Sequence, residues 1–548
     1  MTAAIAQALS AADIALAYHA RTKHRLDRYA AGPETLDWDA QPNPFREFAG
    51  APRTELPLTA DLLDTRFSQI IRPGAVAPNP FSKASIAALL ELSFGLSAWK
   101  EYGPDRWALR CNPSSGNLHP TEAYVLANGV AGIEDGLHHY ISRDHALELR
   151  SPAGAPQSGA PHLCIGLSSI HWRESWKYGE RAFRYCQLDL GHAIGALRYA
   201  ATILGWKATL LAELTTTELA AVMGLDRAED FAGAEREDPD ALIAITPHTA
   251  GSLDTSEMAR LLASATPRGP WTGRANLLDR HPMYRWPTID EVSRATHGAG
   301  HAEPADLSSA PPRKHPSHAR AADIVIGRRS AQRFDTKFSM SADVFYGLLD
   351  SLLMRPGAPW DTWAFQPAIH LVLFVHRVDG VEPGLYALPR HPSAASSLRT
   401  AMRSDFSWQP VDGAPAHVPL FQLHTSDYRA VAKSLSCHQA IAADSCFTLS
   451  MIAEFEPHVR ANPWRYRQLH WEAGLLGHVL YLEAEAAGLR GTGIGCYFDD
   501  ALHELIGLRD QQFQSLYHFT VGRPLVDSRI TTEPGYPGRR EPARGNPP

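Results

Sequence analysis

The sequence predicts an α+β fold made of two similar α/β sandwich domains fused in tandem, and three observations support this. The chain has 548 residues, which is more than one hydrophobic core ordinarily serves. Short apolar runs typical of buried strands alternate with two long helical segments. One ordered pattern of residues also occurs twice, which indicates an internal repeat.

The repeat is clearest in a pattern of Arg, acid, Gly and a second Gly. Its two versions are Arg184, Asp189, Gly191 and Gly205, and then Arg467, Glu472, Gly474 and Gly488. The spacing is the same in both, and weaker matches upstream follow the same order. We therefore expect two copies of one domain, not two unrelated helical patterns that happen to look alike.

The repeat sets the expected domain boundaries. Residues 1–250 form the first domain with an N-terminal extension, and residues 319–530 form the second. Residues 251–318 are rich in Pro and Gly and predict a linker that wraps the surface. Residues 531–548 predict a flexible tail. A growing offset between the copies predicts an insertion near residues 395–435.

Local patterns predict the main elements in chain order. An Ala-rich start without a basic region predicts a helix within residues 1–20, not a secretion signal. Helical apolar spacing predicts further helices over residues 84–97, 181–204 and 466–487, the last closed by Gly488. Apolar runs predict strands at residues 123–128, 164–167, 368–375 and 517–521.

Composition excludes several classes of function. The chain has 52 Lys and Arg against 59 Asp and Glu, a net charge of −7, which does not suit nucleic-acid binding. Its apolar runs are shorter than the roughly 18 to 20 residues of a membrane span. Six cysteines without paired or zinc-like spacing predict buried, inert thiols and no metal site. We expect a cytoplasmic protein.

A tandem repeat has a consequence for function. Two copies in one chain can replace a twofold dimer, whose two interface sites are identical. Fusion lets the halves diverge, so one interface site can be retained while the other decays. Motifs present in only one copy are therefore the candidates for the retained site.

The first such motif is the loop Pro113-Ser114-Ser115-Gly116-Asn117. Its backbone N–H groups and short polar side chains can hydrogen-bond the edge of a flat heteroaromatic ring. A plain turn or a helix N-cap is the alternative. The matching stretch of copy two, Arg355 to Pro367, lacks the polar residues.

The second motif is Arg328-Arg329-Ser330 at the start of copy two. Adjacent guanidinium groups beside a hydroxyl suit a phosphate monoester, because Arg makes paired charge-assisted hydrogen bonds. The alternative is a solvated basic turn. Copy one offers only Arg21 and Lys23 as a weak counterpart.

Two further motifs lie beside the long helices. Glycines around Ile494, in Gly493-Ile494-Gly495-Cys496, would let the backbone approach a ligand, or would simply form a loop. Lys177-Tyr178 precedes the helix of copy one and offers two groups that can donate or accept protons. A surface pair with its charge in solvent is the alternative for Lys177 and Tyr178.

Taken together, these motifs resemble the FMN-dependent nitroreductase superfamily. Lys177-Tyr178-Gly179 followed by Arg181 and Gly191-His192 is similar to one branch, the SagB/ThcOx-type dehydrogenases, and more narrowly to its tandem members. The resemblance implies two nitroreductase-like domains that form an intramolecular pseudo-dimer with FMN at their interface. It covers most of residues 15–530.

The resemblance also implies roles for individual residues. Arg328, Arg329 and Ser330 would hold the phosphate and ribityl chain, with Arg529 reaching the phosphate. Ile494, Gly495 and Cys496 would lie along the isoalloxazine ring. From the other copy, the residues that would close on the ring are Pro113, Ser114, Ser115 and Asn117. A second site, built from Arg21, Lys23 and the altered loop, is expected to be empty or remodelled.

The resulting hypothesis is an FMN-dependent oxidoreductase that passes hydride between flavin and a small-molecule or peptide-derived substrate, with Lys177 or Tyr178 moving a proton. Two alternatives stay open. One is an NAD(P)H-dependent nitro or quinone reductase. The other is a flavin-free scaffold in a biosynthetic complex. The pseudo-dimer could act alone or pair again as a homodimer.

Overall fold

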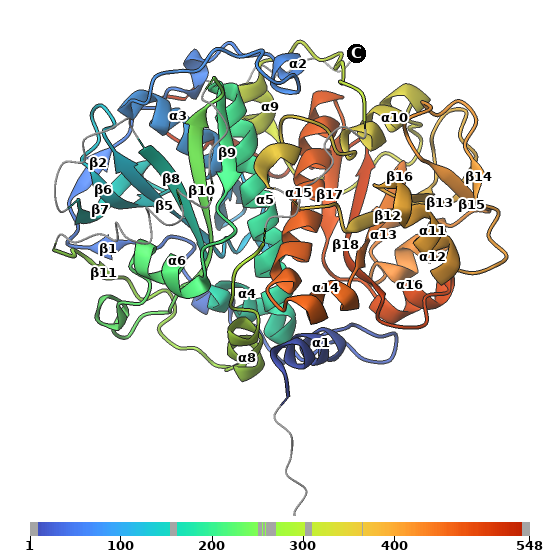
Figure 1. Ribbon diagram of the computed structural model, residues 1–548, viewed down its shortest axis with the longest axis horizontal. Helices are drawn as coiled ribbons and strands as arrows, with labels where there is room; N and C mark the ends of the chain where they lie inside the picture. The colour runs from blue at the N-terminus through green and yellow to red at the C-terminus, as the bar shows by residue number, and fades with distance from the viewer. Residues whose placement is uncertain are drawn as a thin grey trace, which may run out of the picture.

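The molecule consists of two antiparallel seven-stranded sheets with two long helices between them (Figure 1). The computed structural model describes residues 9–153, 162–249, 255, 258, 270–301, 310–363 and 365–539. One sheet lies on each side of the helix pair, and further helices cover the outer faces. The predicted α+β tandem architecture is confirmed.

The two sheets have the same strand order, which is the structural form of the sequence repeat. In the first half the order across the sheet is β2 (Arg53–Glu55), β7 (Ala146–Pro152), β6 (Gly136–Ile141), β5 (Thr121–Asn128), β8 (His162–Ser169), β10 (Asp238–Pro247), β9 (Trp206–Leu210). In the second half it is β14 (Gln409–Pro410), β15 (Phe421–Thr425), β13 (Gly384–Leu388), β12 (Ile369–Val375), β16 (Phe447–Glu454), β18 (Phe513–Gly522), β17 (Arg490–Ile494). Each long helix runs directly into the edge strand, β9 or β17.

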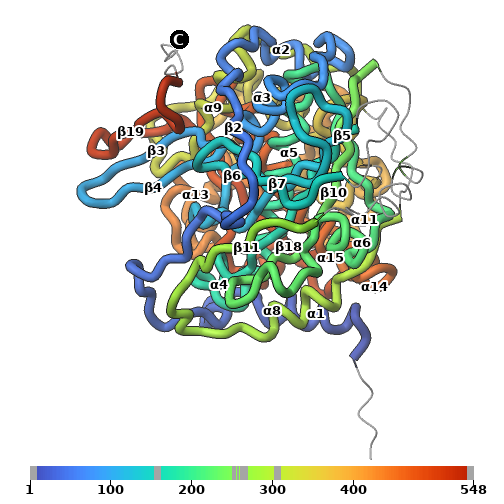
Figure 2. The backbone as a smooth tube through the Cα atoms, turned by 90° about the vertical axis from the view of Figure 1, so that its left-hand side faces the viewer, coloured from blue at the N-terminus to red at the C-terminus, as the bar shows by residue number. Residues whose placement is uncertain are grey.

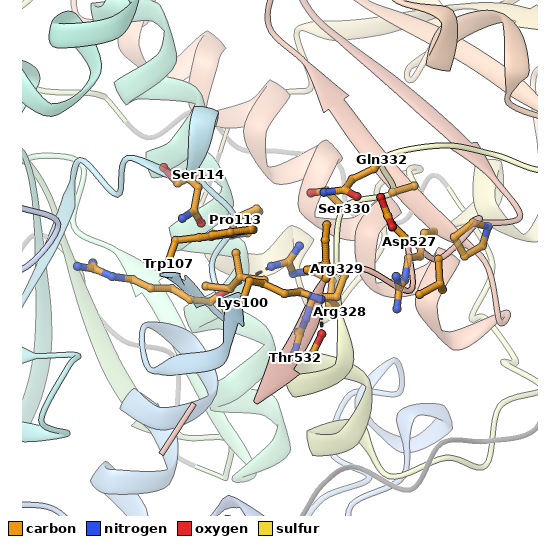
Figure 3. A pocket seen from close by; sticks show the side chains of 18 of the residues that line it. Lys100, Trp107, Pro113, Ser114, Arg328, Arg329, Ser330, Gln332, Asp527 and Thr532 are labelled. Carbon is orange, nitrogen blue, oxygen red and sulfur yellow. Dashed lines mark hydrogen bonds between the residues drawn. The ribbon is translucent and has the colours of Figure 1, made fainter. Parts of the chain in front are cut away.

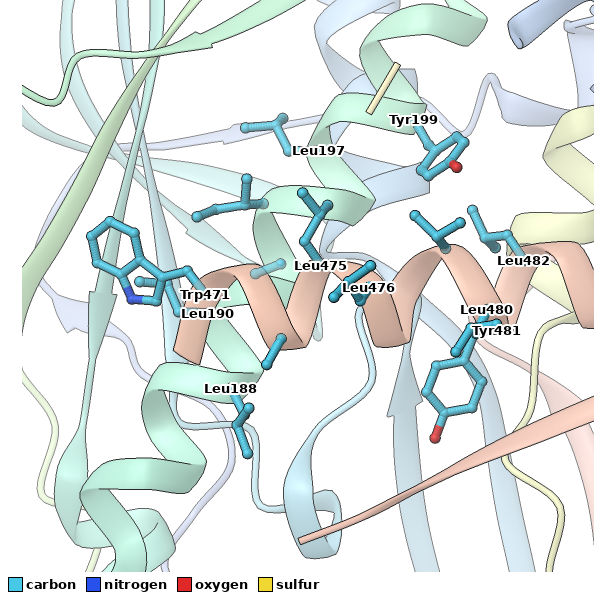
Figure 4. Close-up of a cluster of buried hydrophobic side chains, with 14 of the residues drawn as sticks. Leu188, Leu190, Leu197, Tyr199, Trp471, Leu475, Leu476, Leu480, Tyr481 and Leu482 are labelled. Atoms are coloured by element: carbon cyan, nitrogen blue, oxygen red, sulfur yellow. The ribbon is translucent and has the colours of Figure 1, made fainter. Parts of the chain in front are cut away.

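The central helices, α5 (Ala182–Ile203) and α15 (Arg465–Ala486), pack on each other along their length (Figure 4). They cross at the repeated glycines. A Cβ built on Gly474 would lie 2.1 Å from the backbone oxygen of Leu188, and one built on Gly191 would lie 2.2 Å from that of Trp471. Only glycine at both positions permits this approach. The contact is flanked by large apolar side chains of both helices.

The other repeated residues explain the rest of the pattern. Arg184 of the first half donates to Asp499 of the second at 2.8 Å, and Arg467 of the second donates to Asp240 of the first at 2.8 Å. These arginines and acids are buried, so breaking either pair would leave an uncompensated charge in the interior. The repeat therefore encodes an interface between halves, not only the fold of each half.

The halves also exchange their ends. Helix α1 (Ala11–Arg21) of the first half lies against α14 (Glu456–Ala461) of the second, and His24 forms a bridge with Phe498. In return, β19 (Thr531–Pro534) near the C-terminus pairs with β3 (Leu96–Tyr102) of the first half, as Figure 2 shows. Strand β4 (Asp105–Arg110) completes this small sheet.

The remaining elements complete the layers. A two-stranded ribbon joins β1 (Phe48–Ala49) to β11 (Arg274–Ala275). The other helices are α2 (Phe67–Ile70), α3 (Lys83–Ser93), α4 (His171–Tyr178), α6 (Thr216–Met223), α8 (Pro287–Ala295), α9 (Ala321–Gly327), α10 (Ala342–Ser351), α11 (Pro392–Ala401), α12 (Arg429–Leu435), α13 (Ala440–Asp444) and α16 (Asp499–Ile506). Among the helices of the described residues, none combines the length and apolar character of a membrane span.

Most predicted elements are present, with shifted ends. The helix expected over residues 84–97 ends at Ser93, because the apolar run continues into strand β3 from Leu96. The expected insertion contains α11, β14, β15 and α12.

Two expectations about irregular segments are wrong in part. The region expected to be an irregular linker contains helix α8, whose Ile289 and Val292 are buried against the core. The tail expected to be flexible from residue 531 is ordered through Arg539, because β19 pairs with β3 and Tyr536 is buried. Residues 540–548 lie outside the described residues.

The helix crossing yields a prediction. Gly474→Ala should lower stability by about 3 kcal/mol or more, since its methyl group has no space between two backbones. Gly347→Ala in α10 is the matched control, because a Cβ there meets nothing within 4 Å; it should be neutral or stabilising by about 0.5–1 kcal/mol. Urea denaturation measures both. Equal midpoints for the two variants would contradict the close crossing.

Candidate functional site

A cavity of about 300 Å³ lies where the two halves meet, and it brings two predicted motifs together (Figure 3). The first half contributes Lys100, Trp107, Leu109, Arg110, Asn112, Pro113, Ser114, Asn117 and His119. The second half contributes Arg328, Arg329, Ser330, Ala331, Gln332, Arg490, Pro524, Leu525, Val526, Asp527, Ile530 and Thr532. Neither half forms this cavity without the other.

Positive charge dominates one end of the cavity. Burial lowers the pKa of Arg329 to about 10, with Arg328 beside it adding to the effect. Burial and the Arg329 charge lower the pKa of Lys100 to about 8. The buried Nε of Arg328 has no hydrogen-bond partner in the described part of the chain. Cations crowded in this way are stabilised by an anion of two or more charges.

Local structure explains why the two arginines point here. Helix α9 ends at Gly327, and Arg328 is its C-cap, so the chain turns into the interface at this point. Arg328 then donates to the backbone oxygen of Arg110 in the first half at 3.2 Å. Arg329 donates to the backbone oxygen of Ser97 at 3.1 Å. The basic pair is therefore fixed by the opposite half and is not a solvated turn.

Ser330 connects the basic pair to the glycine motif behind it. Its hydroxyl lies 2.8 Å from the hydroxyl of Tyr481, which also accepts the Gly493 N–H at 3.1 Å. The Arg328 guanidinium lies 4.9 Å from the centre of the Tyr481 ring. Tyr481 thus sets the distance between Arg328, Ser330 and the start of the glycine segment.

The loop at Pro113–Asn117 is shaped by an unusual backbone and one buried acid. Gly116 and Asn117 both have left-handed φ values, 59° and 61°. The backbone N–H and hydroxyl of Ser115 donate to the Asp189 carboxyl at 3.0 and 2.8 Å. Pro113, Ser114 and Asn117 line the cavity, while Ser115 anchors the loop from behind.

Asp189 and Glu174 form a pair of buried carboxyl groups next to this loop. Burial raises the pKa of Asp189 to about 7, and burial together with the Asp189 charge raises that of Glu174 well above its usual value. Both side chains are almost fully buried. Two adjacent carboxyl groups in such a place hold at least one proton at neutral pH. Glu174 lies outside the sequence motifs, and its buried carboxyl group is seen only in the structure.

Lys177 and Tyr178 end helix α4, and Tyr178 packs directly against this loop. The Tyr178 hydroxyl approaches Gly116 so closely that a Cβ there would lie 2.4 Å from it. Burial raises the pKa of Tyr178 well above its usual value and lowers that of Lys177. The Lys177 ammonium lies 5.4 Å from the centres of the Trp38 and Tyr178 rings.

Seven predicted site residues do not line the cavity. Three of them, described above, pack behind the loop or beside it: Ser115, Lys177 and Tyr178. The other four are Ile494, Gly495, Cys496 and Arg529. Ile494 is buried in a core of the second half, and the Gly495 carbonyl accepts a hydrogen bond from the Tyr185 hydroxyl at 3.1 Å. Cys496 faces His24 and Cys437. The Arg529 side chain is 69% exposed and pairs with Asp527 at 2.6 Å, although its neighbours Asp527 and Ile530 line the cavity.

Several cavity residues were not predicted. Lys100 and Trp107 come from the β3–β4 hairpin, which carries no recognisable motif. Residues 524–532 form a wall because β19 ties the C-terminal segment to β3, a long-range pairing that local sequence does not show. Arg490 is the exception: it directly precedes the glycine segment and could have been found there.

The pseudo-symmetric position holds a much smaller cavity of about 40 Å³. Its lining includes Arg198 and Lys207, the counterparts of Tyr481 and Arg490 under the repeat spacing, and Asp361 of the altered loop. Arg198 donates to Asp361 twice, at 2.8 and 2.9 Å, which fills the space.

The expected residues of this second site are not there. Arg21 pairs with Glu180, and Lys23 pairs with Asp500, both away from the altered loop. The residues that the resemblance would require for a second site therefore do not meet the altered loop.

A separate cluster of His370, His391 and Glu454 has the residue types of a metal site. However, the Nδ1 atoms of both histidines accept backbone N–H groups, from Arg390 and Ala394 at 3.2 Å each. Each neutral ring therefore carries its proton on Nε2, facing Glu454. Metal-ligating histidines normally donate through the other nitrogen, so this cluster is arranged as a hydrogen-bond network.

Comparisons with known proteins place the chain among nitroreductase-like proteins. No family model matches. The structure superposes on a crystal structure described as a nitroreductase of Anabaena variabilis with a TM-score of 0.65 and 20% identity, over 93% of this chain and 99% of that one. This likeness shows that the fold is the nitroreductase fold across nearly the whole molecule.

Two proteins with related sequences provide a second comparison. The chain is 30% identical over 193 residues to the trifolitoxin-processing protein TfxB of Rhizobium leguminosarum bv. trifolii, covering 31% of this chain and 52% of TfxB. It is 27% identical over 139 residues to a candidate nitroreductase of Methanocaldococcus jannaschii, covering 23% and 66%. The chain thus spans about half to two thirds of these relatives. The resemblance to nitroreductase-like proteins is therefore confirmed, and the likeness to TfxB agrees with the resemblance to the SagB-type branch.

The buried carboxyl pair gives a prediction about pH. The folded chain keeps a proton on Asp189 up to about pH 7, while the unfolded chain loses it near 3.8, so this group's contribution to stability falls as pH rises between these values. Asp189→Asn should therefore reduce the fall in Tm between pH 5 and 8 by roughly a few degrees. Calorimetry at several pH values measures this. Asp405→Asn, an exposed control, should change it little, and identical pH profiles for D189N and wild type would contradict the raised pKa.

Proposed function

We propose that this protein is an FMN-dependent oxidoreductase with one flavin site, formed by both halves. The observation that carries the proposal is the cationic cavity between Arg328, Arg329 and the Pro113–Asn117 loop. These are the two motifs that the sequence keeps in opposite copies. Their convergence in one cavity is what a flavoenzyme dimer interface requires once it is fused into a single chain.

The basic end of the cavity fits the FMN phosphate. Arg328 with its unpaired Nε, Arg329 and Lys100 would bind the phosphate oxygens through charge-assisted hydrogen bonds. Ser330 and Gln332 offer neutral polar groups for the ribityl hydroxyls. Arg529 would have to leave Asp527 to join them.

The other end of the cavity supplies the features that a ring system needs. Pro113 and Ser114 present a flat, polar loop edge, and Asn117 stands beside them. When bound, FMN would supply hydride transfer at its N5 atom. The proposed ring contacts from the second half remain Ile494, Gly495 and Cys496. In the structure, the side chains of Tyr178 and Tyr185 lie between these residues and the loop.

The residues around Tyr178 would hold protons and transfer them during the reaction. Glu174 and Asp189 hold at least one proton behind the loop, and Tyr178 keeps its phenolic proton because burial raises its pKa. Burial lowers the pKa of Lys177, so its ammonium group releases a proton more readily than that of a solvent-exposed lysine. Lys177 and Tyr178 are therefore the proposed catalytic residues.

The relatives suggest the class of substrate. TfxB is named for the processing of trifolitoxin. We therefore propose that the substrate is a small molecule or a residue of a modified peptide. The intramolecular pseudo-dimer is sufficient for one site, because the Arg198–Asp361 pair fills the other.

The proposal predicts a preference for FMN over riboflavin, which lacks the phosphate. Wild type should bind FMN more tightly, by about ten- to a hundredfold, a range that one or two charge-assisted hydrogen bonds supply. Arg328→Ala and Lys100→Ala should each lose most of that preference while riboflavin binding changes little. Quenching of flavin fluorescence during titration measures both ligands.

Arg429→Ala is the matched control, because Arg429 is exposed and pairs with Asp427, away from the cavity. It should bind both flavins like wild type. A wild-type protein that takes up no FMN, or that binds FMN and riboflavin equally, would contradict the proposed phosphate site. Rapid bleaching of bound flavin by NADPH would identify a reductase that uses a nicotinamide donor.

A further inference from the structure

A pair of cysteines lies on the far side of the glycine segment, outside the cavity. Of the six cysteines, only Cys437 and Cys496 are partly exposed; Cys111, Cys164, Cys186 and Cys446 are buried. The expectation that all six are buried and inert is therefore wrong for these two. The Cys437 side chain faces that of Cys496, and Gln439, two residues further on, donates to the Cys496 backbone oxygen at 3.1 Å, so the two cysteines are neighbours.

A histidine from the opposite half completes the cluster. The Nδ1 atom of His24 accepts the backbone N–H of Ala30 at 3.0 Å, so the neutral ring carries its proton on Nε2. The ring also faces the Cys496 side chain. His24 is held in place by its own backbone N–H, which donates to Asp499 at 3.1 Å. It is therefore a fixed proton donor to a Cys496 thiolate.

The backbone at Cys437 is strained. Cys437 and His438 have φ values of 51° and 62°, two successive left-handed non-glycine residues between α12 and α13. Such residues cost free energy and persist where the surrounding structure holds them, often at functional sites. Here the loop is held by Gln439, which donates to the Cys496 backbone oxygen at 3.1 Å. The strain places the Cys437 thiol against Cys496.

The charges around the pair favour a thiolate on Cys496 in particular. The hydrogen bond from Cys437 lowers the pKa of Cys496, against its partial burial, and His24 and Arg181 lower it further. The same hydrogen bond, with burial, raises the pKa of Cys437. The other titratable groups that face the pair are Tyr29, Tyr178, Tyr185 and Asp499. In contrast, burial raises the pKa of Cys446 to about 11.

We propose that Cys437 and Cys496 form a thiol–disulfide exchange site for low-molecular-weight disulfides, with Cys496 as the attacking thiol and Cys437 as the resolving thiol. This inference does not depend on flavin binding. Partial exposure admits a small reagent, and the neighbouring sulfurs allow an internal disulfide.

The exchange balances in two steps. The Cys496 thiolate attacks one sulfur of a disulfide RSSR; its S–S bond breaks, RS⁻ leaves and takes up the proton that Cys496 released, and a mixed disulfide forms. Cys437 then loses its proton and attacks the Cys496 sulfur, and the second RS⁻ leaves and is protonated. The dithiol is oxidised by two electrons, and RSSR is reduced to two RSH.

Alkylation followed by peptide mapping tests the reactivity. With limiting iodoacetamide at pH 7, Cys496 should react at least tenfold faster than Cys446. His24→Gln should slow the reaction of Cys496 several-fold and move its pH midpoint upward. Cys446→Ser is the matched control and should leave the rate at Cys496 unchanged. Equal, slow labelling of Cys437, Cys496 and Cys446 would overturn the proposal.

Mass spectrometry after treatment with oxidised glutathione tests the exchange. Wild type should lose about two mass units, for two hydrogens, and carry no adduct. Cys437→Ser should accumulate one glutathione adduct on Cys496, and Cys496→Ser should show neither product. A stable adduct on wild-type Cys496, or no change in mass, would overturn the proposal even if Cys496→Ser fails to fold.

Discussion

The close crossing of α5 and α15 is the contact on which the rest of the structure depends. Gly191 and Gly474 bring the two helix backbones together, and this sets the distance between the sheets. Arg184 and Arg467 leave the same helices and each reach an acid of the opposite half. Asp189, two residues before Gly191, holds the Pro113–Asn117 loop. The crossing, the interface and the candidate site therefore share one helical segment.

Divergence of the two halves explains why one interface position has a large cavity and the other only a small one. At the open position, Tyr481 packs beside Arg328, and Arg490 lines the cavity together with Arg328 and Arg329. At the closed position, Arg198 replaces Tyr481 under the repeat spacing and forms a paired salt bridge with Asp361. A basic residue and an acid that neutralise each other attract an anion less than the adjacent arginines of the open position do. The same scaffold thus supports a binding site on one side and a structural ion pair on the other.

The fold could be predicted well because the repeat is visible as a regular local spacing, although the contacts it indicates join distant parts of the chain. The sequence revealed the Arg–acid–Gly pattern before any contact was known, and it identified Arg328, Arg329 and the Pro113 loop. It could not reveal Lys100 or residues 524–532, which reach the cavity through the pairing of β19 with β3. It also missed Glu174 and Cys437, whose properties depend on burial and on neighbours far away in the chain.

The central claim is that the two halves form one flavin site per chain. Its most direct test is the stoichiometry of FMN on the purified protein, measured from the flavin absorbance after saturation and removal of free ligand. The account predicts one FMN per chain, because the Arg198–Asp361 pair occupies the second position. Two FMN per chain, or none, would contradict it.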